Sequence, residues 1–221
     1  MTARGCASAG GVRRCRWLMC AVTILAAGCT QTVTGTAVRA APGIDEGSRS
    51  PVDVDTVLLD RSAMQAITGA GDGLTEVPGM DSKVPVDIDM MAEAVPAQCR
   101  WLFAETQVFG SEVEEFHKTT YQYPARGALI SQAAAGYRDS ATAQRAFGAL
   151  ADSIRGCGET GPGYALVGQV AATADSVRTR PGNCGRDYRV KAVVLVEVTF
   201  CAFPDAVPDI VMSNILAHVP A

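Results

Sequence analysis

The clearest pattern along the chain is an amphipathic helix predicted over Ser140–Arg155. Its apolar residues recur at intervals of three and four, which gathers them on one helix face. Gly156 and Gly158 predict the end of this helix beside Cys157. A last helix is predicted with Pro208 near its start, and its apolar stripe comprises Val207, Val211, Ile215 and Val219.

Strand-like segments separate these helices. Phe116–Tyr123 and Ala128–Tyr137 are predicted strands joined by a Pro-Ala-Arg-Gly turn, and Tyr164–Ala172 is strand-like. Gly185–Val190 and Val193–Phe200 are predicted to form a hairpin. In its second strand, the side chains alternate between the two faces of the sheet. The apolar residues Val194, Val196, Val198 and Phe200 share one face, and Glu197, Thr199 and Cys201 share the other.

Three weaker elements complete the pattern. A capping box of Ser62 and Gln65 predicts a short helix that ends at Gly69. A long loop rich in Gly, Pro and Asp follows to Asp89, and Trp101–Phe109 is a predicted short helix. The order of helices and hairpins predicts an α+β domain, with a mainly antiparallel sheet and helices packed on one face.

The N-terminus has the three parts of an export signal. A basic stretch ends at Arg16, an apolar run of about a dozen residues follows, and small residues precede Cys29. The segment 25–29, Leu-Ala-Ala-Gly-Cys, resembles a bacterial lipobox. We therefore predict a signal peptide over residues 1–28 and a diacylglyceryl group on Cys29, which anchors the chain to the outer face of the cell membrane. An uncleaved anchor and an ordinary signal with an accidental cysteine are the alternatives, and Arg13-Arg14 raises a twin-arginine route.

Residues 29–53 are predicted to be a lipidated, flexible tether. From Thr30 to Asp53 the chain is rich in Thr, Ser, Gly and Pro and has no apolar periodicity, so it cannot bury enough surface to offset the entropy of ordering it. The alternative is that 33–39 adds a strand to the domain. Residues 54–221 then form one domain.

Charge disfavours one class of partner. The chain has a net charge of −4, but four of its 19 basic residues and none of its 23 acidic residues lie in the predicted signal peptide. The mature protein is therefore more acidic than the whole chain. Nucleic-acid binding needs a basic surface, so we expect no nucleic-acid partner.

Four cysteines are left after the signal peptide and Cys29 are set aside. An even number in an exported chain predicts two disulfides, for which three pairings exist. Folding the predicted hairpin at its midpoint brings Cys184 opposite Cys201, and Cys99 then pairs with Cys157. This register also places Asp187 and Arg189 opposite apolar positions, which requires a bulge or a partly open face. The spacing disfavours the alternative, a zinc site.

Candidate chemical residues are few. The segment 112–117 places Glu112, Glu114 and Glu115 before His117, which allows metal binding or acid–base chemistry but favours a solvated acidic stretch. Four aspartates alternate with apolar residues and fit strand edges better than a calcium loop (Asp53, Asp55, Asp87, Asp89). The polar and aromatic residues expected to line any groove are Trp101, Phe103, Arg186, Tyr188 and Arg189.

Several motifs together resemble the PknH-like extracellular sensor domain, found on mycobacterial membrane kinases and as stand-alone lipoproteins. They are Leu58-Leu59 with Ser62, Pro96-Ala-Gln-Cys99, Tyr137-Arg-Asp-Ser140, Cys157-Gly158, and Asn183-Cys184 followed by Val193-Val-Leu-Val and Cys201. The resemblance spans about 54–220. It implies a twisted antiparallel sheet flanked by helices, two disulfides and a groove able to take a ligand, and it supplies no catalytic residue.

We therefore expect a non-catalytic envelope lipoprotein that binds a small molecule, glycan, lipid or envelope protein, without a cofactor or a metal. The alternative is a structural or protein-interaction role without a small-molecule site. An enzyme is least favoured, because the sequence has no nucleophile elbow and its four domain cysteines are assigned to disulfides. A concave apolar pocket would favour the binding role over the structural one.

Overall fold

A computed structural model describes residues 50–221, and the predicted signal peptide and most of the predicted tether lie outside this range. Within it, seven strands form one antiparallel sheet in the order β1-β2-β3-β7-β6-β5-β4. The strands are β1 (Thr75–Glu76), β2 (Glu115–Tyr123), β3 (Ala128–Gly136), β4 (Gln169–Ala172), β5 (Ser176–Arg180), β6 (Cys184–Lys191) and β7 (Val194–Cys201).

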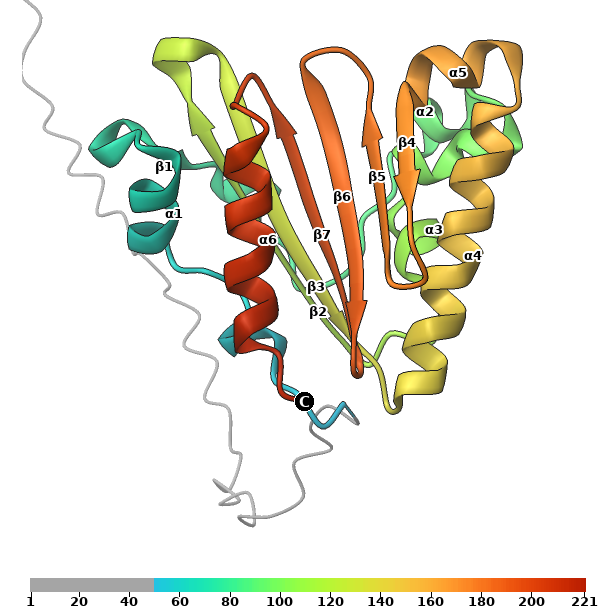
Figure 1. Cartoon of the computed structure of the whole chain (residues 1–221), viewed down its shortest axis with the longest axis horizontal. Coiled ribbons are helices and arrows are strands. Elements are labelled where there is room, and N and C mark those ends of the chain that lie inside the picture. The colour runs from blue at the N-terminus through green and yellow to red at the C-terminus, as the bar shows by residue number, and fades with distance from the viewer. Residues whose placement is uncertain (1–49) are drawn as a thin grey trace, which may run out of the picture. The chain divides into compact units, whose positions relative to one another are not determined.

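Helices cover both faces of this sheet, which corrects the expectation of one covered face. They are α1 (Arg61–Thr68), α2 (Asp89–Glu93), α3 (Glu105–Phe109), α4 (Ser140–Gly158), α5 (Gly161–Val167) and α6 (Ala206–His218). The sheet runs between α6 and α4 (Figure 1). Both faces of the central strands β3 and β7 carry buried apolar side chains, so each face needs a cover over at least part of its length.

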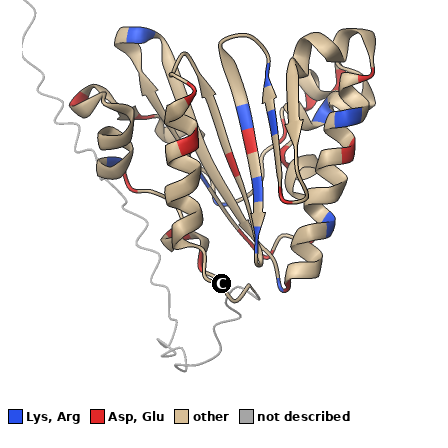
Figure 2. Cartoon of the chain, in the orientation of Figure 1, with Lys and Arg blue, Asp and Glu red and all other residues tan. Residues whose placement is uncertain are grey.

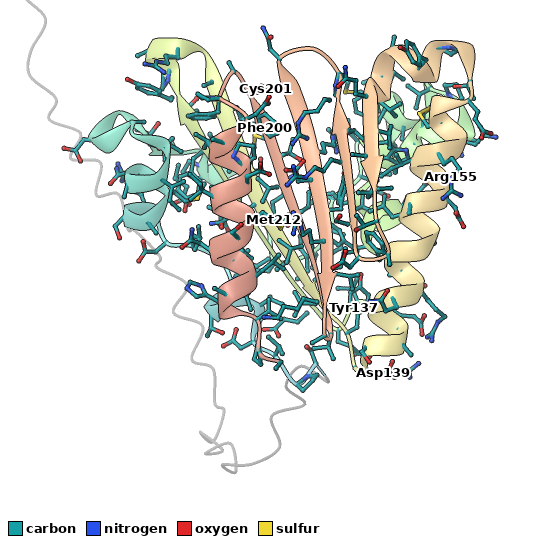
Figure 3. The ribbon with its side chains drawn as sticks, in the orientation of Figure 1. Tyr137, Asp139, Arg155, Phe200, Cys201 and Met212 are labelled. Atoms are coloured by element: carbon teal, nitrogen blue, oxygen red, sulfur yellow. A yellow bond between two sulfur atoms is a disulfide. The ribbon has the colours of Figure 1, made fainter. Side chains whose placement is uncertain are left out.

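Two hydrophobic clusters fill the spaces on either side. One joins α1 and α6 to the β7 face that carries Phe200, and Met212 of α6 belongs to it (Figure 3). The other joins α3 and α4 to the opposite face, and Tyr137 at the end of β3 belongs to it. The sheet, both clusters and both disulfides are contained in residues 50–221.

The domain begins earlier than the tether prediction allows. Ser50 and Val52 are buried, and Val52 belongs to the α6-side cluster. Ser50 fills a space left by Gly136, where a Cβ would lie 2.5 Å from the Ser50 Oγ. A single valine in a polar stretch has no periodicity, so the pattern could not reveal this contact.

The disulfides are present in the predicted pairs. Cys184 lies directly opposite Cys201 in the β6–β7 register, with Cα atoms 4.0 Å apart. Cys157 in α4 is bonded to Cys99 in the 3-10 helix Ala97–Leu102, called η4. The helix α4 was predicted to end at Arg155, before the glycines beside Cys157. It instead continues past Cys157 and ends at Gly158.

The conflict in the hairpin register is resolved without a bulge. Asp187 pairs in strict register with Val198 and is fully buried. Arg180 reaches it from β5, with its guanidinium nitrogen 2.5 Å from Asp187 and its carbon 4.9 Å above the ring of Phe200. Gly185 leaves room for this stack, because a Cβ there would lie 2.7 Å from both groups. Figure 2 shows basic and acidic residues close together along β6.

Other differences arise at helix ends. Asp60, not Ser62, caps α1 by accepting a hydrogen bond from the Ala63 amide. The predicted 101–109 helix is divided between η4 and α3. The first part of the predicted 164–172 strand is α5, because Thr160 caps a helix there by accepting from the Gly163 amide. The strand β5 was not predicted, since it has one apolar residue, Val177.

Candidate ligand-binding groove

A groove opens on the α4 side of the sheet, at the end nearer the Cys184–Cys201 bridge. The strand register aligns one polar row, Thr120, Ser131, Thr199 and Arg186, and the last three of these residues line the floor of the groove. The elements α3, α4 and η4 cover the apolar part of this face. The polar row falls beyond that cover, so a hollow of about 280 Å³ forms over it.

The outer wall of the groove is the segment 80–91, which we call the lip. Of the nine large hydrophobic side chains exposed in the described range, six lie in it (Met80, Val84, Val86, Ile88, Met90, Met91). An adjoining hollow of about 300 Å³ shares Met80, Val86 and Ile88 with the groove. The lip therefore gives the groove an apolar rim open to solvent.

Glu197 is the central polar group of the floor. Its residue is 4% exposed, and its Oε1 accepts hydrogen bonds from Thr199 at 2.7 Å, Tyr188 at 3.1 Å and Arg186 at 3.4 Å. Burial, reinforced by the Glu197 charge, raises the pKa of Tyr188 well above its ordinary value. Tyr188 therefore stays protonated and serves as a donor.

Arg186 joins the floor to the inner wall. It donates to the Leu102 carbonyl at 2.8 Å, and its guanidinium carbon lies 5.7 Å from the centre of the Trp101 ring. Burial alone lowers the pKa of Arg186, but the attraction of nearby groups, the Glu197 carboxylate among them, outweighs it, so the pKa lies above its ordinary value. The guanidinium is a permanent charge whose counter-charge is Glu197.

A second ion pair ties the lip to the groove. Lys118 of β2 binds Glu105 at the start of α3, and both side chains are mostly buried. The other Glu105 oxygen accepts from the Val86 amide at 2.8 Å. Asp87 accepts from the amide and the hydroxyl of Thr106. These bonds hold the lip against α3.

Among the residues that line the groove, one buried polar atom has no hydrogen-bond partner within residues 50–221. This atom is the indole Nε1 of Trp101, a hydrogen-bond donor without an acceptor. The whole Trp101 residue is 1% exposed, so bulk solvent does not supply one. The hydrogen bonds to the Glu197 carboxylate go to Oε1, so Oε2 keeps its capacity to accept, although it is not one of the buried unpaired atoms. Unpaired buried polar groups are rare, because each costs free energy unless water or a ligand satisfies it.

The sequence model of the PknH-like extracellular domain matches residues 50–213. The chain belongs to this family. A crystal structure of the extracellular domain of PknH from Mycobacterium tuberculosis has the same fold, with a TM-score of 0.56 and 13% sequence identity over 76% of this chain and 97% of that chain. No curated protein matches the sequence. No helix in the described part of this PknH-like domain has the length and apolarity needed to cross a membrane.

The PknH-like domain brings three of the five predicted groove residues together. Trp101, Phe103 and Arg186 line the groove. Tyr188 is fully buried and contacts Glu197 through its hydroxyl. Arg189 lies on the opposite face, because it pairs with Val196 and therefore points to the α6 side.

Sequence reasoning missed Glu197, Lys118 and Glu105. Glu197 had a signal, since it is a charged residue inside an otherwise apolar alternating strand. Lys118 and Glu105 had none, because a contact between residues 13 positions apart in different elements leaves no local pattern.

The acidic segment before His117 does not form a site with it. His117 lies between Asp55 and Asp81, at 2.8 and 3.2 Å, on the α6 side of the sheet. Glu112 contacts Arg138 and Arg145 instead. In the described part of the domain, no group of three or more His, Cys, Asp or Glu side chains is arranged to hold a metal ion.

Three of the four alternating aspartates differ from the strand-edge expectation, and Asp87 fits it. Asp53 caps the 3-10 helix Val54–Thr56, called η1, which contains Asp55. Asp87 forms a bridge with Ala104, as a strand edge would, and Asp89 begins α2.

Proposed function

We propose that the protein is a lipid-anchored, extracytoplasmic binding module that takes a ligand into the groove between the sheet and the lip. The observation that carries this proposal is a concave site with an apolar rim and a buried indole donor, Trp101 Nε1, that has no acceptor within the described residues. A structural role would not need such a site. Cys29 supplies the anchor in this proposal, and it lies outside the described residues.

The contacts favour binding over catalysis. The four cysteines of the described range are in disulfides, which leaves no thiol nucleophile there. Both histidines of that range lie outside the groove, since His117 contacts Asp55 and His218 lies 3.1 Å from the Val57 carbonyl. The charged groups of the groove are already paired with each other. A non-catalytic site fits this arrangement.

Binding is tested with N-phenyl-1-naphthylamine, an uncharged dye whose emission rises in apolar surroundings. We expect saturable binding to the wild-type domain and its loss in Thr199→Phe, whose ring extends over the floor. Ser213→Phe places the same ring on exposed α6 and serves as the control. Equal binding to both variants would contradict the groove as the site.

The anchor is tested by the intact mass of protein purified from host membranes. We expect a species that starts at Cys29 and carries a diacylglyceryl group, with four thiols appearing only after reduction. An unmodified N-terminus would overturn the lipid anchor and leave the groove proposal unaffected.

A further inference from the structure

The charges of the groove cancel within the protein. Arg186 is paired with Glu197, and Lys118 is paired with Glu105. All four side chains are at least partly buried, with exposed fractions of 26%, 6%, 22% and 14%. A charged ligand head would lose its hydration in this site without meeting an uncompensated counter-charge, which is unfavourable.

The polar groups of the floor and the inner wall define a complementary head group. Trp101 Nε1 lacks a hydrogen-bond acceptor, and the Glu197 carboxylate keeps the capacity to accept at Oε2. A hydroxyl or an amide supplies both an acceptor and a donor in one small uncharged group. The neighbouring Ser131 and Thr199 hydroxyls extend this polar strip. The floor therefore matches a neutral, hydroxylated or amide-bearing head.

The rim defines the rest of the ligand. Met80, Val86, Ile88 and Met91 line the groove, yet each stays between 43% and 51% exposed. An apolar chain leaving the floor would cover these side chains, and removal of their apolar surface from water favours binding. A wholly polar ligand would leave this rim in water.

We propose that the groove binds an uncharged amphiphile, with its hydroxyl or amide head on Glu197 and Trp101 and its apolar chain along the lip. This inference rests on the proposed function and adds the chemical class of the ligand to it. It also explains why buried charge pairs, polar hydroxyls and exposed methionines occur in one hollow.

Three probes with the same eight-carbon chain separate the head groups: octyl glucoside, octanoate and octyltrimethylammonium, each below its micelle concentration. They are titrated into residues 43–221, which contain the whole sheet, both clusters and both disulfides. We expect octyl glucoside to bind at least about tenfold more tightly than either charged probe, as the uncompensated charge predicts. Equal or tighter binding of a charged probe would overturn the neutral head and support the groove itself.

The Trp101 indole gives a direct readout of the head. Trp101 is the sole tryptophan of this fragment, so its Nε1–H gives one side-chain signal in a proton–nitrogen NMR spectrum. Octyl glucoside should move that proton downfield as the hydroxyl accepts its hydrogen bond. An unmoved indole signal at saturation would overturn the contact with Trp101.

The chain position is tested with a matched pair of variants. Ile88→Ser removes an apolar side chain, 51% exposed, from the lip, and Ile210→Ser removes one that is 45% exposed on α6. We expect the first to weaken octyl glucoside binding about fivefold or more, following the loss of about 1 kcal/mol of apolar contact, and the second to leave it unchanged. Equal effects would overturn the placement of the chain. Failure of all three probes together with saturable binding of the naphthylamine dye would overturn the amphiphile and retain the groove.

Discussion

Asp187 and Arg180 form a buried ion pair across β6 and β5, with the Asp187 side chain 1% exposed and its Oδ1 2.5 Å from the Arg180 Nη1. Arg178 approaches the other carboxylate oxygen at 3.8 Å and also binds Asp209 of α6. The part of the α6 face over β4–β6 is thus polar and held by charge, while the part over β7 is held by apolar packing. The carboxylate depends on its arginines, since little solvent reaches it.

Removal of Arg180 should therefore destabilise the domain strongly. Arg180→Met leaves Asp187 with the distant Arg178 alone, and loss of one partner of a buried pair costs about 3 kcal/mol. Urea unfolding at neutral pH measures this change. Arg155→Met is the control, because Arg155 pairs with Asp152 on the exposed face of α4, where ion pairs contribute little. An equal effect of the two variants would contradict the role of the Arg180–Asp187 pair.

The two disulfides should contribute unequally to stability. Cys99 and Cys157 are 58 residues apart, and Cys184 and Cys201 are 17 apart. Closing the longer loop removes more entropy from the unfolded chain. The chain-entropy model therefore predicts that the first bridge stabilises the fold by about 4 kcal/mol and the second by about 3 kcal/mol. Paired Cys→Ala variants, compared by urea unfolding under oxidising conditions, test the order. A greater loss in the Cys184/Cys201 variant would contradict it.

The start of α4 should titrate in acid. Asp139 accepts hydrogen bonds from the amide and the hydroxyl of Thr142, which lower its pKa below the ordinary value of 3.8 (Figure 3). A carboxyl with a lowered folded-state pKa stabilises the protein above the unfolded pKa, and this contribution is lost as pH falls through the folded pKa. Asp139→Asn keeps the acceptor and removes the charge. The melting-temperature advantage of wild type over this variant should therefore shrink as pH falls below about 3.8.

Melting curves measured between about pH 5 and about pH 2 test this expectation, because this range extends from above to below the ordinary aspartate pKa. Asp152→Asn, exposed and outside the first turn of the same helix, is the control. A wild-type advantage that stayed constant across this range would show that Asp139 does not titrate with folding.

The site was only partly predictable from the sequence. Trp101, Phe103 and Arg186 were named because polar and aromatic side chains are typical of grooves, and they do line one. The lip was predicted as a loop, which its composition indicates, but nothing in that loop shows that Glu105 and Thr106 hold it against α3. The unpaired indole of Trp101 is a property of its surroundings, so no pattern in the chain can reveal it.

By itself, the sequence determined the elements whose signal is local. The α4 helix follows from its apolar spacing, the β6–β7 hairpin from alternation, and the Cys184–Cys201 bridge from the symmetry of that hairpin. Only the tertiary structure decided that helices cover both faces, that Arg180 neutralises Asp187 without a bulge, and that polar residues of four strands meet in one groove. The reason is physical: spacing along the chain records which side of an element is apolar, whereas partners across space are chosen by packing and by the need to satisfy buried charge.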